Sequence, residues 1–227
     1  MPLFSTLDLV ALAWFLAVWA AYAAAMAAVE RRKRGLNSEM TGYRDAWMSQ
    51  MLGRDLRMVD AQIVAALQNG TAFFASTSLI AVGGALTLLR SPAEILEVIA
   101  ALPFGVKPTA VQWEAKTIGL AVIFVYAFFK FAWSYRLFNY VAILVGATPP
   151  AAQKDTAEAK AHAARVGRLA AAAGRHFNRG QRAFFFALGY LGWFISPWLL
   201  MATSVAVAVI MWRRQFASDS RRALLGP

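Results

Sequence analysis

Two cations, Lys130 and Arg136, lie inside a long apolar segment, residues 117–147. A cation within the hydrocarbon of a bilayer costs roughly 3 kcal/mol, so such residues usually face a protein interior or a hydrated cavity. At 100° per residue, both cations fall on one face of a helix together with three aromatic residues. We call this set the basic-aromatic stripe: Tyr126, Lys130, Trp133, Arg136 and Tyr140. Asn139 points the other way, so this helix is expected to contact more than one neighbour.

The stripe carries the chemistry of an anion site. Arginine supplies paired donors and lysine a compact charge, a combination that suits phosphate, carboxylate or a lipid headgroup. A second apolar segment, residues 61–89, could add neutral hydrogen-bonding groups, for which the candidates are Asn69, Ser76 and Thr77. Small and polar residues recur there at every seventh position: Gln62, Asn69, Ser76 and Gly83. Close helix packing and the lining of a polar cavity opposite the stripe both explain this spacing, and both can hold at once.

The composition indicates that these residues sit in a membrane protein. Hydrophobic residues make up 59% of the 227 and charged residues 15%. Four segments exceed the roughly 20 residues that span a bilayer, near 7–29, 61–89, 117–147 and 183–212. Backbone groups in lipid must be satisfied within their segment, so each is expected to be a helix. The predicted fold is a single all-α integral membrane domain, 1–227, with four transmembrane helices and two cytoplasmic helical segments, 41–60 and 153–178.

Basic residues set the expected orientation. Loops 31–60 and 148–182 each hold seven Lys and Arg, the N-terminal flank holds none, and loop 90–116 holds three. The positive-inside rule then places both seven-residue sets in the cytoplasm and the N-terminus outside, in a bacterial inner membrane. Four crossings leave the tail after Trp212 outside, despite its four arginines. Asp8 is expected at the outer end in water, and the apolar run 95–102 is expected at the outer surface of the membrane.

The residues that catalysis would need are missing. The chain has no cysteine, no phosphate-binding glycine loop, no zinc-protease helix motif and no glycine-framed serine. His162 and His176 are fourteen residues apart without an acidic pair nearby, so no metal site is expected. We therefore expect neither an enzyme nor a cofactor. The net charge of +11 suits anionic phospholipid, and nucleic acid is not an expected partner, because no soluble basic domain exists to present it.

Several short stretches together resemble a known family. They are residues 73–79 (FFASTSL), 83–84 (GG), 126–133 (YAFFKFAW) with Arg136 and Asn139, 177–180 (FNRG), and Trp193. These stretches are similar to bacterial polytopic membrane proteins grouped as the domain of unknown function 599. The similarity runs from about Arg44 to Phe216. It implies the four-crossing membrane fold and implies no activity or site residue.

Two functions and one simpler explanation follow from the stripe. In the first, the chain forms a homo-oligomer, because four helices enclose little space, and the oligomer binds an anionic ligand or lipid headgroup at Lys130 and Arg136 or lets the anion permeate. In the second, the chain is an accessory or assembly subunit whose stripe docks an acidic partner helix or a bound lipid within a larger membrane complex. In the simpler explanation, Lys130 snorkels along its stem and Arg136 sits at the cytoplasmic interface, because the segment exceeds the length of one crossing.

Overall fold

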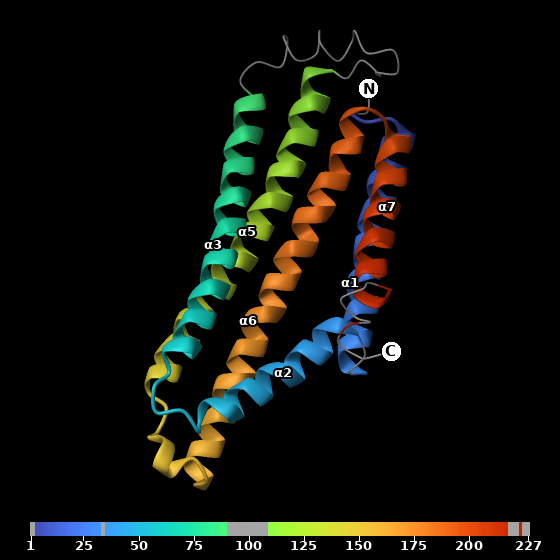
Figure 1. Ribbon diagram of the computed structural model, residues 1–227. Coiled ribbons are helices and arrows are strands. Elements are labelled where there is room, and N and C mark those ends of the chain that lie inside the picture. The colour runs from blue at the N-terminus through green and yellow to red at the C-terminus, as the bar shows by residue number, and fades with distance from the viewer. Residues whose placement is uncertain (1–2, 33–34, 90–108, 218–222, 224–227) are drawn as a thin grey trace. The chain divides into compact units, whose positions relative to one another are not determined.

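Most of the residues that the computed structural model describes, which are 3–32, 35–89, 109–217 and 223, are helical (Figure 1). The helices are α1 (Thr6–Arg31), α2 (Leu36–Met51), α3 (Met58–Leu88), α5 (Ala110–Gly146), α6 (Ala157–Tyr190) and α7 (Pro197–Phe216), with short 3-10 helices η1 (Ala151–Gln153) and η2 (Leu191–Phe194). Four of them, α1, α3, α5 and α7, are long and apolar enough to cross a membrane. The predicted all-α membrane fold with four transmembrane helices is therefore confirmed. The apolar run 95–102 falls outside the described residues.

The connection between α2 and α3 differs from the expectation. The sequence predicts one cytoplasmic helix over 41–60 that runs into the second crossing. In the structure α2 begins earlier, at Leu36, and ends at Met51, and α3 starts separately at Met58. Gly53 and Arg54 close a turn instead, their backbone N–H groups donating to the carbonyls of Gln50 and Met51 at 3.2 and 3.1 Å. A glycine at a helix end is a common stop signal.

The sequence predicts that one helix ends between the cytoplasmic segment 153–178 and the crossing 183–212, but in the structure the helix ends further along the chain. Helix α6 continues without interruption from Ala157 to Tyr190, so the predicted cytoplasmic helix and the start of the predicted crossing 183–212 form one helix. Gly180 lies within this helix and makes no turn. Its lack of a side chain lets the ring of Phe131 pack against the backbone of α6, where a Cβ would lie 2.9 Å from that ring. The chain breaks instead at η2, after which the Ser196 hydroxyl caps the backbone N–H of Leu199 and Pro197 occupies the first turn of α7.

The described residues form two compact units, each of which takes part of the long helices. Unit 1 comprises residues 1–35, 78–126 and 182–227, and unit 2 comprises residues 36–77 and 127–181. The core of unit 1 is aromatic, with Phe15, Phe186, Tyr190 and Trp193 buried together. The core of unit 2 is aliphatic, and its buried residues include Met48, Met51, Val64, Val141 and Val166.

Within unit 1, α1 and α7 run in the same direction, side by side (Figure 1). At one end Phe4, just before α1, stacks on Trp193, just before α7, with ring centroids 5.3 Å apart. At the other end a Cβ on Gly35 would lie 3.5 Å from the ring of Phe216. Two parallel helices that cross a membrane leave it on the same side. The final part of α6 returns antiparallel to α1, as the contacts of Phe186 with Trp19 and of Tyr190 with Phe15 show. This packing favours a tail on the side where α1 ends, whereas the sequence-based count places the tail on the opposite side.

This arrangement predicts that the tail and loop 31–60 are accessible from one face of the membrane. The chain has no cysteine, so single cysteines can be introduced without further changes. In membrane vesicles of known orientation, an impermeant maleimide should label Ser49→Cys and Ala217→Cys from the same side, and Leu3→Cys from the other. Labelling of Ala217→Cys together with Leu3→Cys would contradict the parallel arrangement.

Candidate functional site

Four residues of the basic-aromatic stripe lie together on α5 in unit 2. The Nε of Arg136 donates a hydrogen bond of 2.7 Å to the Tyr140 hydroxyl, and its guanidinium carbon lies 5.7 Å from the centroid of that ring. The ring of Trp133 meets the ring of His176, on α6, edge to face with centroids 6.4 Å apart. Trp133, Arg136 and Tyr140 are exposed, whereas Lys130 is half-buried.

Three basic side chains, Lys130, Arg175 and Arg179, act electrostatically on His176, which contacts the stripe at Trp133. Burial lowers the pKa of its imidazole first, and the positive charges of Lys130, Arg179 and Arg175 lower it further. None of the described carboxylates acts on this pKa, and the Nδ1 atom of His176 is buried without a hydrogen-bond partner. We call these four residues, Lys130, Arg175, His176 and Arg179, the basic cluster.

One more cation adjoins the basic cluster from α2. A Cβ on Gly174 would lie 3.0 Å from a guanidinium nitrogen of Arg44. Burial lowers the pKa of Arg44, Arg175 lowers it further, and Asp45 acts in the opposite direction. The α6 members of the cluster were missed because the sequence predicts a separate cytoplasmic helix and turn in this region. Arg175, His176 and Arg179 are close enough in sequence to share one side of a helix, and this spacing could have revealed them if α6 had been predicted as one continuous helix.

The length of α5 places the cluster near the membrane surface. At 1.5 Å per residue, Lys130 lies about 21 Å and Arg136 about 30 Å along the helix from Lys116, which pairs with Asp8 in the first turn of α1. A span of about 30 Å matches the hydrocarbon thickness of a bilayer. With Lys116 at one surface of the bilayer, Arg136 would fall at the headgroup depth of the other, and the stem of Lys130 is long enough for its ammonium to approach the same level.

The residues predicted to complete the site lie elsewhere. Asn69 and Ser76 have exposed side chains, and the hydroxyl of Thr77 donates to the Phe73 carbonyl of its own helix at 2.8 Å. Tyr126 belongs to unit 1, where its ring contacts Trp19. The buried face of α3 also repeats every seven residues, but two positions further on, at Val64, Thr71, Ser78 and Ala85. The larger apolar surface of that row explains why it packs inward.

Asn139 behaves as expected and faces a second neighbour. Its side-chain oxygen accepts a hydrogen bond from the Gln68 amide of α3. His162 also has a structural role, because its Nε2 atom lies 2.9 Å from the Leu144 carbonyl and the residue is buried. Among the described residues, no group of three potential ligands could hold a metal ion.

A polar network in unit 1 was not anticipated. Lys116, counted above as a loop residue, is buried in α5 and donates 2.8 Å to the backbone carbonyl of Trp193. Its ammonium lies 3.7 Å from the Asp8 carboxylate, which also accepts a 2.8 Å hydrogen bond from the indole N–H of Trp193. Asp8 is thus paired within the protein and not simply solvated. We refer to Asp8, Lys116 and Trp193 as the Asp8 network.

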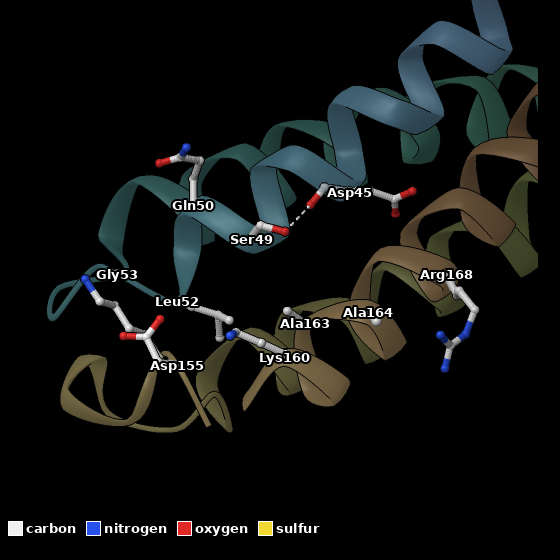
Figure 2. A pocket seen from close by; sticks show the side chains of 11 residues that line it. Asp45, Ser49, Gln50, Leu52, Gly53, Asp155, Lys160, Ala163, Ala164 and Arg168 are labelled. Atoms are coloured by element: carbon white, nitrogen blue, oxygen red, sulfur yellow. Dashed lines mark hydrogen bonds between the residues drawn. The ribbon is translucent and has the colours of Figure 1, made fainter. Parts of the chain in front are cut away.

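A groove of about 640 Å³ lies between α2 and the first turns of α6 (Figure 2). Asp45, Ser49 and Gln50 line it from α2, and Lys160 and Arg168 face it from α6. All of these side chains are exposed, and Ser49 donates to the backbone carbonyl of Asp45 on its own helix. Mixed charges that remain in water are typical of a solvated surface groove, so we assign no binding role to it.

Comparison with known proteins identifies one matching family. No curated protein and no solved structure matches the chain. A family model described as a protein of unknown function, DUF599, matches residues 10–220. This match covers most of the 227 residues and includes α5, α6 and the basic cluster. The chain belongs to the DUF599 family, whose function is unknown.

Proposed function

We propose that the protein binds the headgroup of an anionic phospholipid at the basic cluster and the adjoining stripe. One observation carries this proposal: basic side chains gather here from two helices, with Arg136 exposed on the same face of α5 as Lys130, and with Lys130, Arg175 and Arg179 all acting electrostatically on the partly buried imidazole of His176 on α6. Like charges held together repel one another, so a bound anion would relieve the repulsion. Phosphate oxygens suit these donors, because arginine and lysine form charge-assisted hydrogen bonds with them.

The surroundings of the cluster favour a headgroup over a permeating ion. Trp133 and Tyr140 are exposed on the surface of α5, where amphipathic aromatic rings are typical of membrane interfaces. Arg136 is also exposed there, at the depth where lipid phosphates lie. A conduction path would instead need these groups to face a shared interior. The snorkelling explanation and the lipid-binding hypothesis therefore both place the charged groups of Lys130 and Arg136 among the lipid headgroups.

Neutralising variants test the proposal directly. Each basic residue near an anionic surface contributes about 1 kcal/mol, so Lys130→Gln and Arg179→Gln should each weaken binding roughly fivefold. Binding can be followed by native mass spectrometry of the purified protein with equal amounts of phosphatidylglycerol and phosphatidylcholine. Arg165→Gln removes an exposed cation from the same helix, outside the cluster, and serves as the control. Equal retention of the two lipids by the unaltered protein, or equal loss in all three variants, would refute the proposal.

Binding should also strengthen as the pH falls. In the free protein the lowered pKa keeps the His176 imidazole neutral at pH 7. A bound phosphate favours the charged imidazole, so binding takes up a proton and affinity rises as the pH falls below about 6.5. The stability of the lipid-free protein should change in the opposite direction. Because the pKa of His176 is lower in the folded than in the unfolded protein, the free energy of unfolding falls as the pH drops from the unfolded-state pKa through the folded-state pKa. Lipid titrations between pH 7.5 and 5.5 should show a slope that His176→Gln removes. An unchanged slope in that variant would exclude this role for His176.

A second candidate function is that of a subunit in a membrane assembly. It rests on the exposed amide of Asn69 and hydroxyl of Ser76 on the membrane-spanning helix α3. Polar side chains on such helices commonly hydrogen-bond to a neighbouring helix. Asn69→Cys in the cysteine-free chain should form a disulfide-linked dimer in native membranes if a second copy covers this face. Exposed Leu79→Cys on the same helix provides the comparison, and equal crosslinking of both would argue against a specific interface.

A further inference from the structure

We infer that an apolar pocket in unit 1 binds one acyl chain of a zwitterionic phospholipid. The pocket has a volume of about 470 Å³, within the range of small-molecule sites. It lies among α1, the first half of α5, the end of α6 and η2. Its walls are largely aromatic, formed by Phe4, Phe15, Trp19, Tyr126, Tyr190 and Trp193.

The aromatic walls are held in place by specific contacts. The phenol of Tyr190 lies against the backbone of α5 at Gly119, where any Cβ would clash with its hydroxyl. Trp19 stacks on Phe186 with centroids 5.4 Å apart, and Phe15 meets Tyr190 edge to face. The Asp8 network fixes both the indole N–H and the backbone carbonyl of Trp193. A pocket whose walls are locked in this way is preorganised and does not need to form around its occupant.

The residues at the rim of the pocket indicate that it opens toward the lipid hydrocarbon. Leu16 of α1 and Val122 of α5 line the pocket and are 53% and 61% exposed. Both belong to membrane-spanning helices, so the opening faces hydrocarbon. A transmembrane helix is 10–12 Å wide with its side chains and does not fit into a space of this volume, whereas a flexible chain of methylene groups does.

The polar end of the site distinguishes the type of lipid. Asp8 and Lys116 contribute one negative and one positive charge, so the Asp8 network has no net charge. The Asp8 side chain is 14% exposed and lies in the first turn of α1, near the end of the span. A polar end with one charge of each sign complements a headgroup that also carries one charge of each sign, as a zwitterionic phospholipid does, whereas the basic cluster of unit 2 suits an anionic headgroup.

Photocrosslinking of the full chain in lipid nanodiscs tests this assignment. Phosphatidylcholine with a diazirine on its acyl chain should label α1 and α5 at the pocket residues, mapped by mass spectrometry. Val122→Phe fills the rim and should abolish this labelling, while Ile118→Phe, an equally exposed position that does not line the pocket, should leave it intact. Leu16→Phe and Leu9→Phe form a second matched pair on α1, so the test does not depend on one variant folding.

Three outcomes would overturn the inference. Labelling spread evenly over Leu9, Ile118 and Val122 would indicate ordinary contact with bulk lipid. A disulfide-linked dimer of a Val122→Cys variant in native membranes would show that a second copy of the chain covers the opening, because the natural chain has no cysteine. Strong labelling by phosphatidylglycerol alone would exclude a zwitterionic lipid. Lys130→Gln should not change the labelling, so failure here can be distinguished from failure of headgroup binding at the basic cluster.

Discussion

Asp8→Asn should destabilise the folded protein by about 3 kcal/mol, because it leaves the buried ammonium of Lys116 without a negative partner. The Lys116 side chain is only 9% exposed, and its ammonium also donates to the carbonyl of Trp193 and lies 5.1 Å from the centroid of that indole ring. Lys116→Met should cost less, about 1 kcal/mol, because Asp8 keeps hydrogen bonds from Ser5 and Trp193.

The double variant provides the control. Asp8→Asn combined with Lys116→Met removes both charges, and its stability should return close to that of Lys116→Met alone. Unfolding in mixed detergent micelles, followed by the helical circular dichroism signal, gives the three values on one scale. If the double variant is as unstable as the sum of the single variants, the two charges are not coupled and the 3.7 Å pair is not what stabilises this end of the fold.

The helical architecture could be predicted because apolar length decides it. A segment such as 117–147 has few alternatives to a membrane-spanning helix, since its backbone must be satisfied internally. The helix ends were predicted less well. Gly180 looks like a turn residue in the sequence, but in the structure it sits where the ring of Phe131 approaches the backbone of α6. A glycine that is needed for packing cannot be distinguished from one that is needed for a turn without knowing its neighbour.

The candidate site was only partly visible for a related reason. Lys130, Trp133, Arg136 and Tyr140 share a face of one helix, and helical periodicity alone reveals that. His176 joins them from α6, and no periodicity links residues on two different helices. For α3 the periodicity was correct but ambiguous: residues 69 and 76 and residues 71 and 78 both repeat by seven, and only packing shows that the second row is buried.

The direction of α7 required the structure as well. Hydropathy detects α1, α3, α5 and α7, and four crossings place the two termini on one side. Helix α6 combines an alanine- and arginine-rich first half with an apolar end, so an average over its length hides its final segment. The parallel packing of α1 and α7 predicts that Arg213 and Arg214, in the last turn of α7, lie on the side where α1 ends, an arrangement that suits the positive-inside rule.

Arg54→Ala should strongly destabilise unit 2, because it removes the cation that pairs with Asp60. The Asp60 side chain is fully buried, and its Oδ1 atom accepts from Arg54 at 2.5 Å and from the indole N–H of Trp47 at 2.7 Å. Its second oxygen is buried without a hydrogen-bond partner. Removal of one partner from a buried ion pair typically costs about 3–5 kcal/mol. The Arg54 side chain is 40% exposed, so water can partly replace it and we expect the lower end of that range.

Asp60→Asn separates the charge from the hydrogen bond to Trp47. An asparagine oxygen can still accept from the indole N–H, and the exposed Arg54 guanidinium remains hydrated, so this variant should lose only about 1 kcal/mol. Combining Asp60→Asn with Arg54→Ala should recover stability relative to Arg54→Ala alone, because the uncompensated buried charge is gone. The same detergent unfolding assay ranks the three variants. If Asp60→Asn is instead the least stable, the carboxylate charge itself is needed at this junction between α2 and α3, and its stabilisation comes from more than Arg54.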